Sequence, residues 1–280
     1  MIIKYGFDIE ISVAQSTPLI TLLDVHESRR AGIITESPFL TRPDVPTAMY
    51  HDQFGNICRR MVAPAGAFSF TLDGLMLDSG EPDFNDPALP EVPIAELPDD
   101  VLVYLLGSRY CETDQLSDLA WKQFGGLAPG WTRVAAIVNF VHQHLTFGYQ
   151  HARATRTAAE AYQERVGVCR DFAHLTIALC RCLNIPARYV NGYLGDIGVP
   201  KDPAPMDFSA WCEIYLGGRW CTFDARHNKP RIGRIVIARG RDATDVSLIH
   251  TFGAHTLTSF KVWTDEVQEN GLQPKPAVAA

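Results

Sequence analysis

The chain has 280 residues, of which 46% are apolar, so it can bury a substantial core and is long enough for two domains. Its formal net charge of −7 argues against a nucleic-acid-binding protein held by bulk electrostatics. No apolar run approaches the roughly 18 residues of a membrane helix, so we expect no membrane partner. Seven cysteines, an odd number, argue against a disulfide framework and favour a cytoplasmic location.

Residues 1–80 are expected to form a β-rich, antiparallel sandwich-like domain. Apolar side chains alternate at period two from the first residues, which predicts a strand and not a signal peptide. A turn signal at 52–56 predicts a hairpin, and 67–77 is another strand-like stretch. The alternating residues are Tyr5, Phe7, Ile9, Ile11 and Val13.

Prolines and acidic residues dominate the next stretch, 81–100, which is predicted to be a linker and the domain boundary. We expect a second domain at 101–265, followed by a frayed tail at 266–280. The prolines of the linker are Pro82, Pro87, Pro90, Pro93 and Pro98.

The second domain begins with helical patterns and ends with strand patterns, which indicates an α+β fold. Helices are predicted at 114–124, from Thr132 to Leu145, and at 157–162, and a longer one begins at Cys169. The sequence Asn184-Ile185-Pro186 should end this last helix. Strands are predicted at 188–194, 208–216, 219–224, 232–238 and 259–264.

Cys169 is the most informative residue because it follows a glycine turn and opens a helix. Unpaired N–H groups and the positive end of the helix dipole favour a thiolate at this position. A thiolate is a nucleophile, although a buried cysteine can also be a small apolar residue of the core. Asp171, two residues later, suits the first turn of a helix as a capping group, and it is also a candidate for the site lining.

Gly217-Gly218 is a two-residue hairpin turn between two predicted strands. If Leu216 pairs with Arg219, then Asp224 and position 209 become diagonal neighbours on one face. A histidine at position 209, oriented by Asp224 and facing the Cys169 thiol, would complete a Cys-His-Asp triad.

Four stretches together resemble bacterial transglutaminase-like proteins of the cysteine-protease superfamily. The resemblance implies helices packed on an antiparallel sheet in a papain-like core, with Cys169 as nucleophile and Asp224 as the orienting acid. The N-terminal half, with Phe54-Gly55-Asn56, resembles the β-rich domain that often precedes this core. The four stretches are 167–173, 185–190, 210–216 and 219–224.

The sequence departs from the family pattern at the third member of the triad, because Ser209 stands where the family usually has histidine. Serine cannot take a proton from a thiol near pH 7 as imidazole can. His227 is the nearest replacement, provided that the chain turns after Asp224 and swings the imidazole back. His174 is a weaker candidate because it lies about 140° around the helix from Cys169.

Several neighbouring residues have a functional and a structural interpretation. Ser209 either donates a hydrogen bond in the site or only fills the space of a lost histidine. Trp211 is expected to form a packing wall of the site. The basic stretch 226–241 is expected to be solvated strand edges, with a dock for an acidic peptide or carboxylate as the alternative. His142 and His144 point in different directions on a helix, so we expect no metal.

These residues predict cysteine-dependent acyl transfer through a thioester, and the resemblance favours a peptide or protein amide as the substrate. Water would make the protein a cysteine protease or amidase, and an amine would make it a transamidase. We expect no cofactor and no nucleic-acid partner. The alternative is a catalytically impaired binding module, because Ser209 occupies the usual histidine position. The pattern does not define the oligomeric state.

Overall fold

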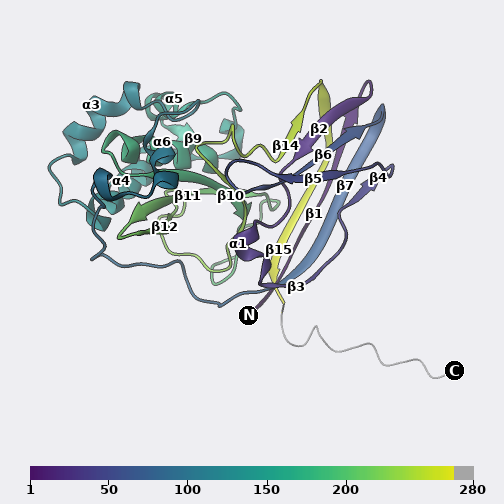
Figure 1. The fold of residues 1–280 in the computed structure, drawn as a ribbon, viewed down its shortest axis with the longest axis horizontal. Coiled ribbons are helices and arrows are strands. Elements are labelled where there is room, and N and C mark those ends of the chain that lie inside the picture. Colours follow the sequence, from purple (N-terminus) through teal and green to yellow (C-terminus); the bar gives the residue numbers. More distant parts are fainter. Residues whose placement is uncertain (268–280) are drawn as a thin grey trace.

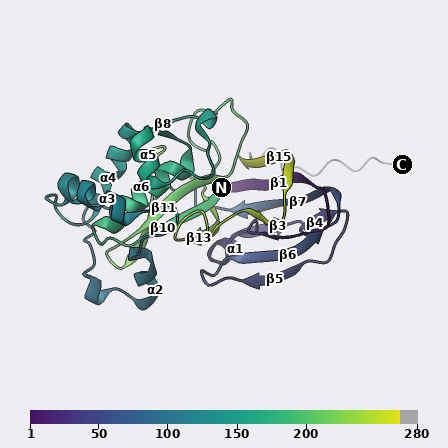
Figure 2. The same ribbon diagram turned by 90° about the horizontal axis from the view of Figure 1, so that it is seen from above.

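A computed structural model describes residues 1–267 of the chain. A β-sandwich and a mixed helix–sheet domain lie side by side, as Figures 1 and 2 show. The sandwich contains α1 (Glu27–Arg30) and the strands β1 (Ile2–Val13), β2 (Thr17–Thr21), β3 (Ile33–Glu36), β4 (Leu40–Arg42), β5 (Ala48–His51), β6 (Ile57–Ala63), β7 (Gly66–Leu77), β14 (Ile249–Thr251) and β15 (His255–Glu266).

The sandwich consists of two antiparallel sheets. One sheet has the order β15-β1-β7-β3, with β4 also paired to β7, and the other has the order β14-β2-β6-β5. The predicted alternation along β1 holds, since Tyr5, Phe7, Ile9, Ile11 and Val13 are all buried. The predicted turn at 52–56 joins β5 to β6 as a hairpin. The α+β fold class is therefore confirmed for both halves of the chain.

The domain boundary at the C-terminal end differs from the prediction. The sequence placed the strand at 259–264 in the second domain, but β15 pairs along its length with β1 of the sandwich. β14 likewise pairs with β2. The chain thus leaves the sandwich and returns to it, and periodicity cannot reveal this because it does not identify a strand's partner. The predicted tail at 266–280 begins at the last residue of β15 and otherwise lies outside the described residues.

The second domain packs helices on a four-stranded antiparallel sheet with the order β12-β11-β10-β13. Its central element, α6, contacts β10, β11 and the helices α3, α4 and α5. The elements are η1 (Ile94–Glu96), α2 (Asp99–Leu102), η2 (Val103–Leu105), α3 (Thr113–Phe124), α4 (Trp131–His144), β8 (Thr146–Phe147), η3 (Tyr149–His151), α5 (Ala158–Glu164), β9 (Val166–Gly167), α6 (Cys169–Cys182), β10 (Ala187–Tyr193), β11 (Ser209–Leu216), β12 (Arg219–Phe223) and β13 (Ile235–Gly240).

Helix α6 is more deeply buried than its sequence suggests. Every residue from Asp171 to Cys182 is buried, so the helix has no solvated face beyond its first two residues. Its start at Cys169 and its stop before Asn184 agree with the prediction. Only the beginning of α6 is therefore within reach of solvent, and that is where Cys169 lies.

The two domains share one hydrophobic core. Aromatic rings cross the boundary, with Tyr5 and Tyr193 at 5.4 Å and Phe7 and Phe208 at 6.4 Å between ring centroids. Phe208 also contacts Phe260 of β15, at 5.9 Å. Phe208 immediately precedes β11, so the sandwich helps to hold the strand that carries Ser209.

The stretch predicted to be a linker is in fact attached to the second domain. Pro82 forms a β-bridge with Ile232, and Asp83 forms an ion pair with Arg234 at 2.9 Å. Residues in the later part of the linker form η1 and the start of α2. The linker therefore supplies a charged group, Asp83, to the second domain.

The longest helices, α4 and α6, have 14 residues each. Across residues 1–267, no helix has both the length and the apolar character that a membrane span requires.

Candidate active site

Cys169 is the first residue of α6, as its sequence context predicts. The chain arrives through β9, whose Gly167 pairs with Phe147 of β8. Gly167 is required by a close approach, because a Cβ at this position would lie 2.6 Å from the Cβ of Asp171. Asp171 accepts a hydrogen bond from the Val168 N–H at 2.9 Å, which confirms its predicted capping role.

The Asp171 side chain is buried and does not form part of the surface of the site. Its side chain is 0% exposed and forms ion pairs with Arg156 at 3.1 Å and with Arg170 at 3.4 Å. It is absent from the lining of the cavity described below, where the sequence analysis made it a candidate. The two arginines offset its charge, so Asp171 anchors the Cys169 turn.

The surroundings of the Cys169 thiol act on its pKa in both directions. Of the seven cysteines, six are buried and Cys169 is partly exposed. Burial nevertheless raises the pKa of the Cys169 thiol to about 11, whereas Arg226 and the backbone of Ala210 lower it. Desolvation therefore opposes the thiolate that the helix terminus is expected to favour.

The predicted hairpin register is confirmed. Leu216 pairs with Arg219 across Gly217-Gly218, and both glycines have positive φ, 55° and 80°, as a tight primed turn requires. The same register places Asp224 just beyond the end of β12, at the end of the hairpin where β11 begins with Ser209.

Asp224 organises a tight turn that brings His227 back toward it. Its Oδ1 accepts hydrogen bonds from the N–H groups of Arg226 at 3.0 Å and of His227 at 3.2 Å. Its Oδ2 lies 2.9 Å from Nδ1 of His227. Asn228 closes the turn with a positive φ of 50° and an N–H bond to the Asp224 carbonyl at 2.7 Å. The sequence predicted this reversal from the residues after the strand.

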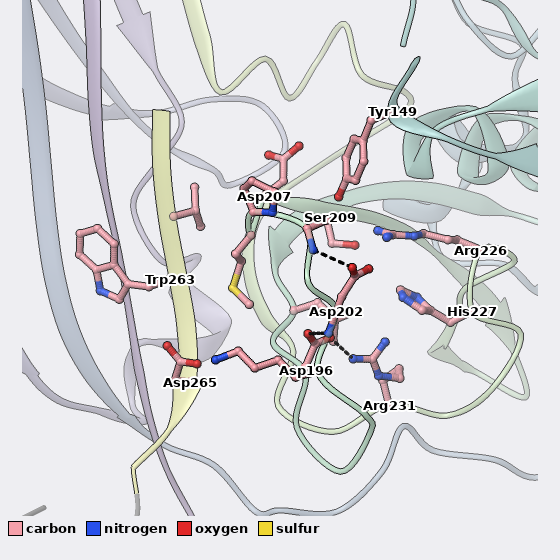
Figure 3. Close-up of a pocket in the computed structure, with 16 residues that line it drawn as sticks. Tyr149, Asp196, Asp202, Asp207, Ser209, Arg226, His227, Arg231, Trp263 and Asp265 are labelled. Carbon is pink, nitrogen blue, oxygen red and sulfur yellow. Dashed lines mark hydrogen bonds and ion pairs between the residues drawn. The ribbon is translucent and has the colours of Figure 1, made fainter. Parts of the chain in front are cut away.

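The Asp224–His227 contact fixes the orientation of the imidazole. The carboxylate accepts the proton on Nδ1, so Nε2 carries the lone pair and is available as a proton acceptor. The imidazole is 19% exposed while the Asp224 side chain is 3% exposed. Figure 3 shows His227 and Arg226 pointing from the same loop into the cavity. Asp224 is thus a buried anchor and His227 is its accessible partner.

Arg234 is a partner of Asp224 that the sequence analysis missed. Burial alone would raise the pKa of Asp224, but Arg234 and His227 hold it well below its usual value. Arg234 donates to Asp224 at 3.0 Å and to both carboxylate oxygens of Asp83 at 2.9 and 3.0 Å. The guanidinium of Arg234 lies over the ring of Trp211 at 4.8 Å. Trp211 therefore supports this ion network and does not line the cavity that contains Ser209.

Helix α4 holds the turn from the other side. His142 donates from Nδ1 to the carbonyl of Ala225 at 2.9 Å, and Asn228 donates to the side chain of Asn139 at 3.1 Å. His144 instead contacts the carbonyl of Tyr162 at 2.7 Å, so the two histidines diverge as predicted. No cluster of three or more metal-ligating side chains occurs within residues 1–267.

A cavity of about 190 Å³ opens beside this turn. Its lining includes Ser209, Arg226, His227, Tyr149 and Asp207, together with residues of β15 from the sandwich (Figure 3). The Ser209 hydroxyl is buried and has no hydrogen-bond partner among residues 1–267. The volume is below the roughly 300–1,000 Å³ of sites for drug-sized ligands, and suits one side chain or a short peptide segment.

Cys169 is not among the residues that line this cavity, but its helix α6 packs on β11, whose first residue, Ser209, lines it. Arg226 and Asp207, which both line it, alter the pKa of Cys169 in opposite directions. Tyr149, also in the lining, has a pKa raised chiefly by burial and in part by Cys169. Ala210, whose backbone acts on the thiol, directly follows Ser209. The imidazole and the hydroxyl therefore share one cavity, and charged groups of its lining act on the Cys169 thiol.

His174, the weaker candidate for the base, is a core residue. It is fully buried and stacks on Tyr110 at 5.2 Å. Its Nε2 accepts a hydrogen bond from the Ala243 N–H at 3.1 Å, and burial lowers the pKa of His174 to about 3. A neutral imidazole engaged in this way is a structural group.

The basic stretch 226–241 is not a solvated edge. Arg231 and Arg234 are buried, and Arg239 pairs with Glu213 at 2.9 Å. Arg226 is the exception, because its guanidinium lies over Phe147 at 3.9 Å without a carboxylate partner in the described chain. The composition of the sequence indicates this basic cluster. Only the fold shows which of its arginines form ion pairs and that Arg226 does not.

A cysteine at the start of a buried helix, packed on an antiparallel sheet whose hairpin leads to Asp224, is the arrangement expected of the transglutaminase-like cysteine-protease fold. Residues 118–225 match the Transglutaminase-like superfamily. The crystal structure of a "putative cysteine protease" from Cytophaga hutchinsonii has a TM-score of 0.83 and 31% identity, over 96% of this chain and 91% of that chain. The protein belongs to the transglutaminase-like superfamily.

Curated relatives match parts of the chain. An uncharacterized protein of Mycobacterium leprae is 36% identical over 95 residues, which are 31% of this chain and 32% of that protein. An uncharacterized protein of Mycobacterium tuberculosis is 28% identical over 143 residues, 48% of this chain and 46% of that protein. The matches span less than half of either relative.

Proposed function

We propose that the protein catalyses acyl transfer from peptide or protein amides through a thioester on Cys169. The observation that carries this proposal is the 2.9 Å contact between Asp224 and Nδ1 of His227, in a turn that lines a cavity together with Ser209 of β11, the strand on which the Cys169 helix packs. It supplies an oriented imidazole although position 209 is a serine. Membership of the transglutaminase-like superfamily supports the reaction class.

In the proposed reaction, His227 acts as a general base in the attack itself. The raised pKa of Cys169 means that the thiol is neutral at pH 7, so its proton must leave as the sulfur attacks. Nε2 of His227 takes that proton while Sγ bonds to the amide carbon. Asp224 stabilises the imidazolium that forms.

The amide nitrogen then leaves with the proton that His227 held, and a thioester remains on Cys169. The first N–H groups of α6 have no intrahelical partners and can donate to the oxyanion. Water attacks the thioester in hydrolysis, and an amine attacks it in transamidation, with His227 again as base. The order of events is the same for both outcomes.

The contrasting candidate is a binding module that keeps the fold without turnover. Two features favour it, namely Ser209 in the usual histidine position and the burial that raises the pKa of the Cys169 thiol. This candidate predicts binding of a peptide without a covalent intermediate.

Acylation by p-nitrophenyl acetate distinguishes the two candidates. We expect release of p-nitrophenolate with an acetyl group on Cys169, located by peptide mass spectrometry. Cys169→Ser should abolish the modification, and Cys58→Ser, which changes a buried cysteine of the sandwich, should not. Acetylation of Cys169 no faster than that of N-acetylcysteine would favour the binding module.

A further inference from the structure

Arg226 is the arginine of the basic stretch that has no internal counter-charge. Arg231 contacts Asp196 at 3.6 Å and Arg234 contacts Asp83 at 2.9 Å, but Arg226 makes no ion pair with any carboxylate of residues 1–267. Its guanidinium is instead held against the ring of Phe147, at 3.9 Å. Arg226 also acts on the Tyr149 hydroxyl through a side-chain hydrogen bond, and the other N–H donors of its stacked guanidinium remain for a ligand.

Two hydroxyl groups accompany Arg226 in the cavity. The Oγ of Ser209 is buried with the residue 4% exposed, and it has no partner in the described chain. A buried hydroxyl without a partner has a desolvation cost that a ligand atom can remove. Figure 3 shows Arg226, Ser209 and the hydroxyl of Tyr149 directed toward the same space. Three donors thus converge at one side of the cavity.

The acidic residues that line the cavity do not neutralise this side. Asp196 contacts Arg231 and accepts the N–H of Asp202 at 2.8 Å. Asp202 in turn accepts the N–H of Ala204 at 2.9 Å. Asp265 belongs to β15, across the cavity from Arg226 in Figure 3. Asp207 also lines the cavity and forms no ion pair with Arg226 in the described chain, although burial raises the pKa of its carboxyl and the charge of Arg226 lowers it.

We propose that Arg226 and Ser209 form a subsite for a substrate carboxylate in the cavity that His227 also lines. A guanidinium and a hydroxyl are complementary to the oxygens of one carboxylate. The cavity of about 190 Å³ accommodates a single acidic group. The inference deepens the proposed function, because it assigns peptides with a carboxylate next to the reacting amide as the substrate class.

The carboxylate has two possible sources in a peptide. It is either the side chain of an aspartate or glutamate next to the reacting amide, or the carboxyl terminus of the chain. Both offer the same oxygens to Arg226, so the experiment below separates them.

The test compares two alkylating reagents that differ only in charge. Iodoacetate carries a carboxylate and iodoacetamide carries a neutral amide in its place. The rate of Cys169 modification by each is measured by mass spectrometry at about pH 9, and the ratio of the two rates is divided by that of N-acetylcysteine. We expect the ratio on Cys169 to be about tenfold higher, as one charge-assisted hydrogen-bonded contact provides.

Variants assign the effect to the subsite. Arg226→Gln should return the ratio to that of N-acetylcysteine, and Ser209→Ala should reduce it about two- to threefold. Arg219→Gln is the matched control, because the Arg219 guanidinium also lies over a phenylalanine ring, Phe84 at 4.2 Å, but does not line this cavity. It should leave the ratio unchanged. A wild-type ratio equal to that of N-acetylcysteine, or one unaffected by Arg226→Gln, would overturn the proposal.

Two isomeric ligands identify the source of the carboxylate. N-acetylglutamate α-amide has only a side-chain carboxylate, and N-acetylglutamine has only a terminal one. Protection of Cys169 from iodoacetamide by one of them, and not by the neutral N-acetylglutamine amide, supports the subsite and names its source. Equal protection by all three compounds, or by none, contradicts it.

The reagent ratio does not depend on turnover. An enhanced ratio without acylation by p-nitrophenyl acetate would overturn the proposed function alone. Normal acylation with an ordinary ratio would overturn the carboxylate subsite alone.

Discussion

Removal of the Arg234 charge should destabilise the protein strongly, because this residue joins two acidic side chains that are shielded from water. Asp224 is 3% exposed and Asp83 is 14% exposed at the side chain. Arg234 donates to both, at 3.0 Å and 2.9 Å respectively. In Arg234→Gln, both carboxylates keep their burial and lose the cation that offsets it.

The expected loss of stability depends on the hydrogen bonds that the carboxylates of Asp224 and Asp83 keep in the variant. Breaking a buried ion pair by removing one partner costs about 3–5 kcal/mol. Asp224 still accepts from two backbone N–H groups and from His227, and Asp83 still accepts from the Arg231 N–H at 2.9 Å. These bonds place the expected loss near the lower limit, about 3 kcal/mol.

Urea unfolding at pH 7, followed by circular dichroism, measures this loss. Arg241→Gln is the control, because Arg241 forms a two-point contact with Asp245 but is 37% exposed. An exposed pair contributes less than about 1 kcal/mol. If Arg234→Gln cost no more than Arg241→Gln, the ion network would not hold the Asp224 turn as we argue.

Two further changes test the surroundings of the site. Gly167→Ala should cost about 1–3 kcal/mol, seen as a lower thermal midpoint, because its Cβ would lie 2.6 Å from that of Asp171; an unchanged midpoint would show that the turn adjusts freely. Burial lowers the pKa of His174 to about 3. Between about pH 6.5 and pH 3 the unfolded chain therefore binds a proton at His174 that the folded chain does not, so the protein should become less stable as the pH falls through this range. The slope should reach at most about 1.4 kcal/mol per pH unit and decrease in His174→Gln, whereas equal slopes in both proteins would contradict a buried neutral imidazole.

Local signals in the sequence were sufficient for the positions of the reacting groups. The turn before Cys169 and the apolar period after it located the start of α6. The paired glycines fixed the hairpin register, which in turn placed Asp224 near position 209. The residues after Asp224 predicted the reversal that returns His227 to its carboxylate. Each of these depends on contacts between residues close in the chain.

Features that depend on distant residues could not be predicted. β15 pairs with β1 from the opposite end of the chain, and a strand pattern does not specify its partner. Asp83 and Arg234 form an ion pair although they lie 151 positions apart in the sequence, so the residues next to either one do not indicate the pairing. The raised pKa of Cys169 has the same origin, because the packing around the thiol decides it and the helix position alone does not.

The central claim is that His227 replaces the missing histidine at position 209 as the base for Cys169. The most direct measurement is the rate of Cys169 acylation by p-nitrophenyl acetate in His227→Ala and in His227→Ala with Ser209→His added. His255→Ala, which removes an exposed histidine of β15 that is bonded to Thr251 through Nδ1, serves as the control. We expect His227→Ala to lower the rate about 10²–10⁴-fold and the added histidine to restore part of it. A rate in His227→Ala equal to those of the wild type and His255→Ala would contradict the claim.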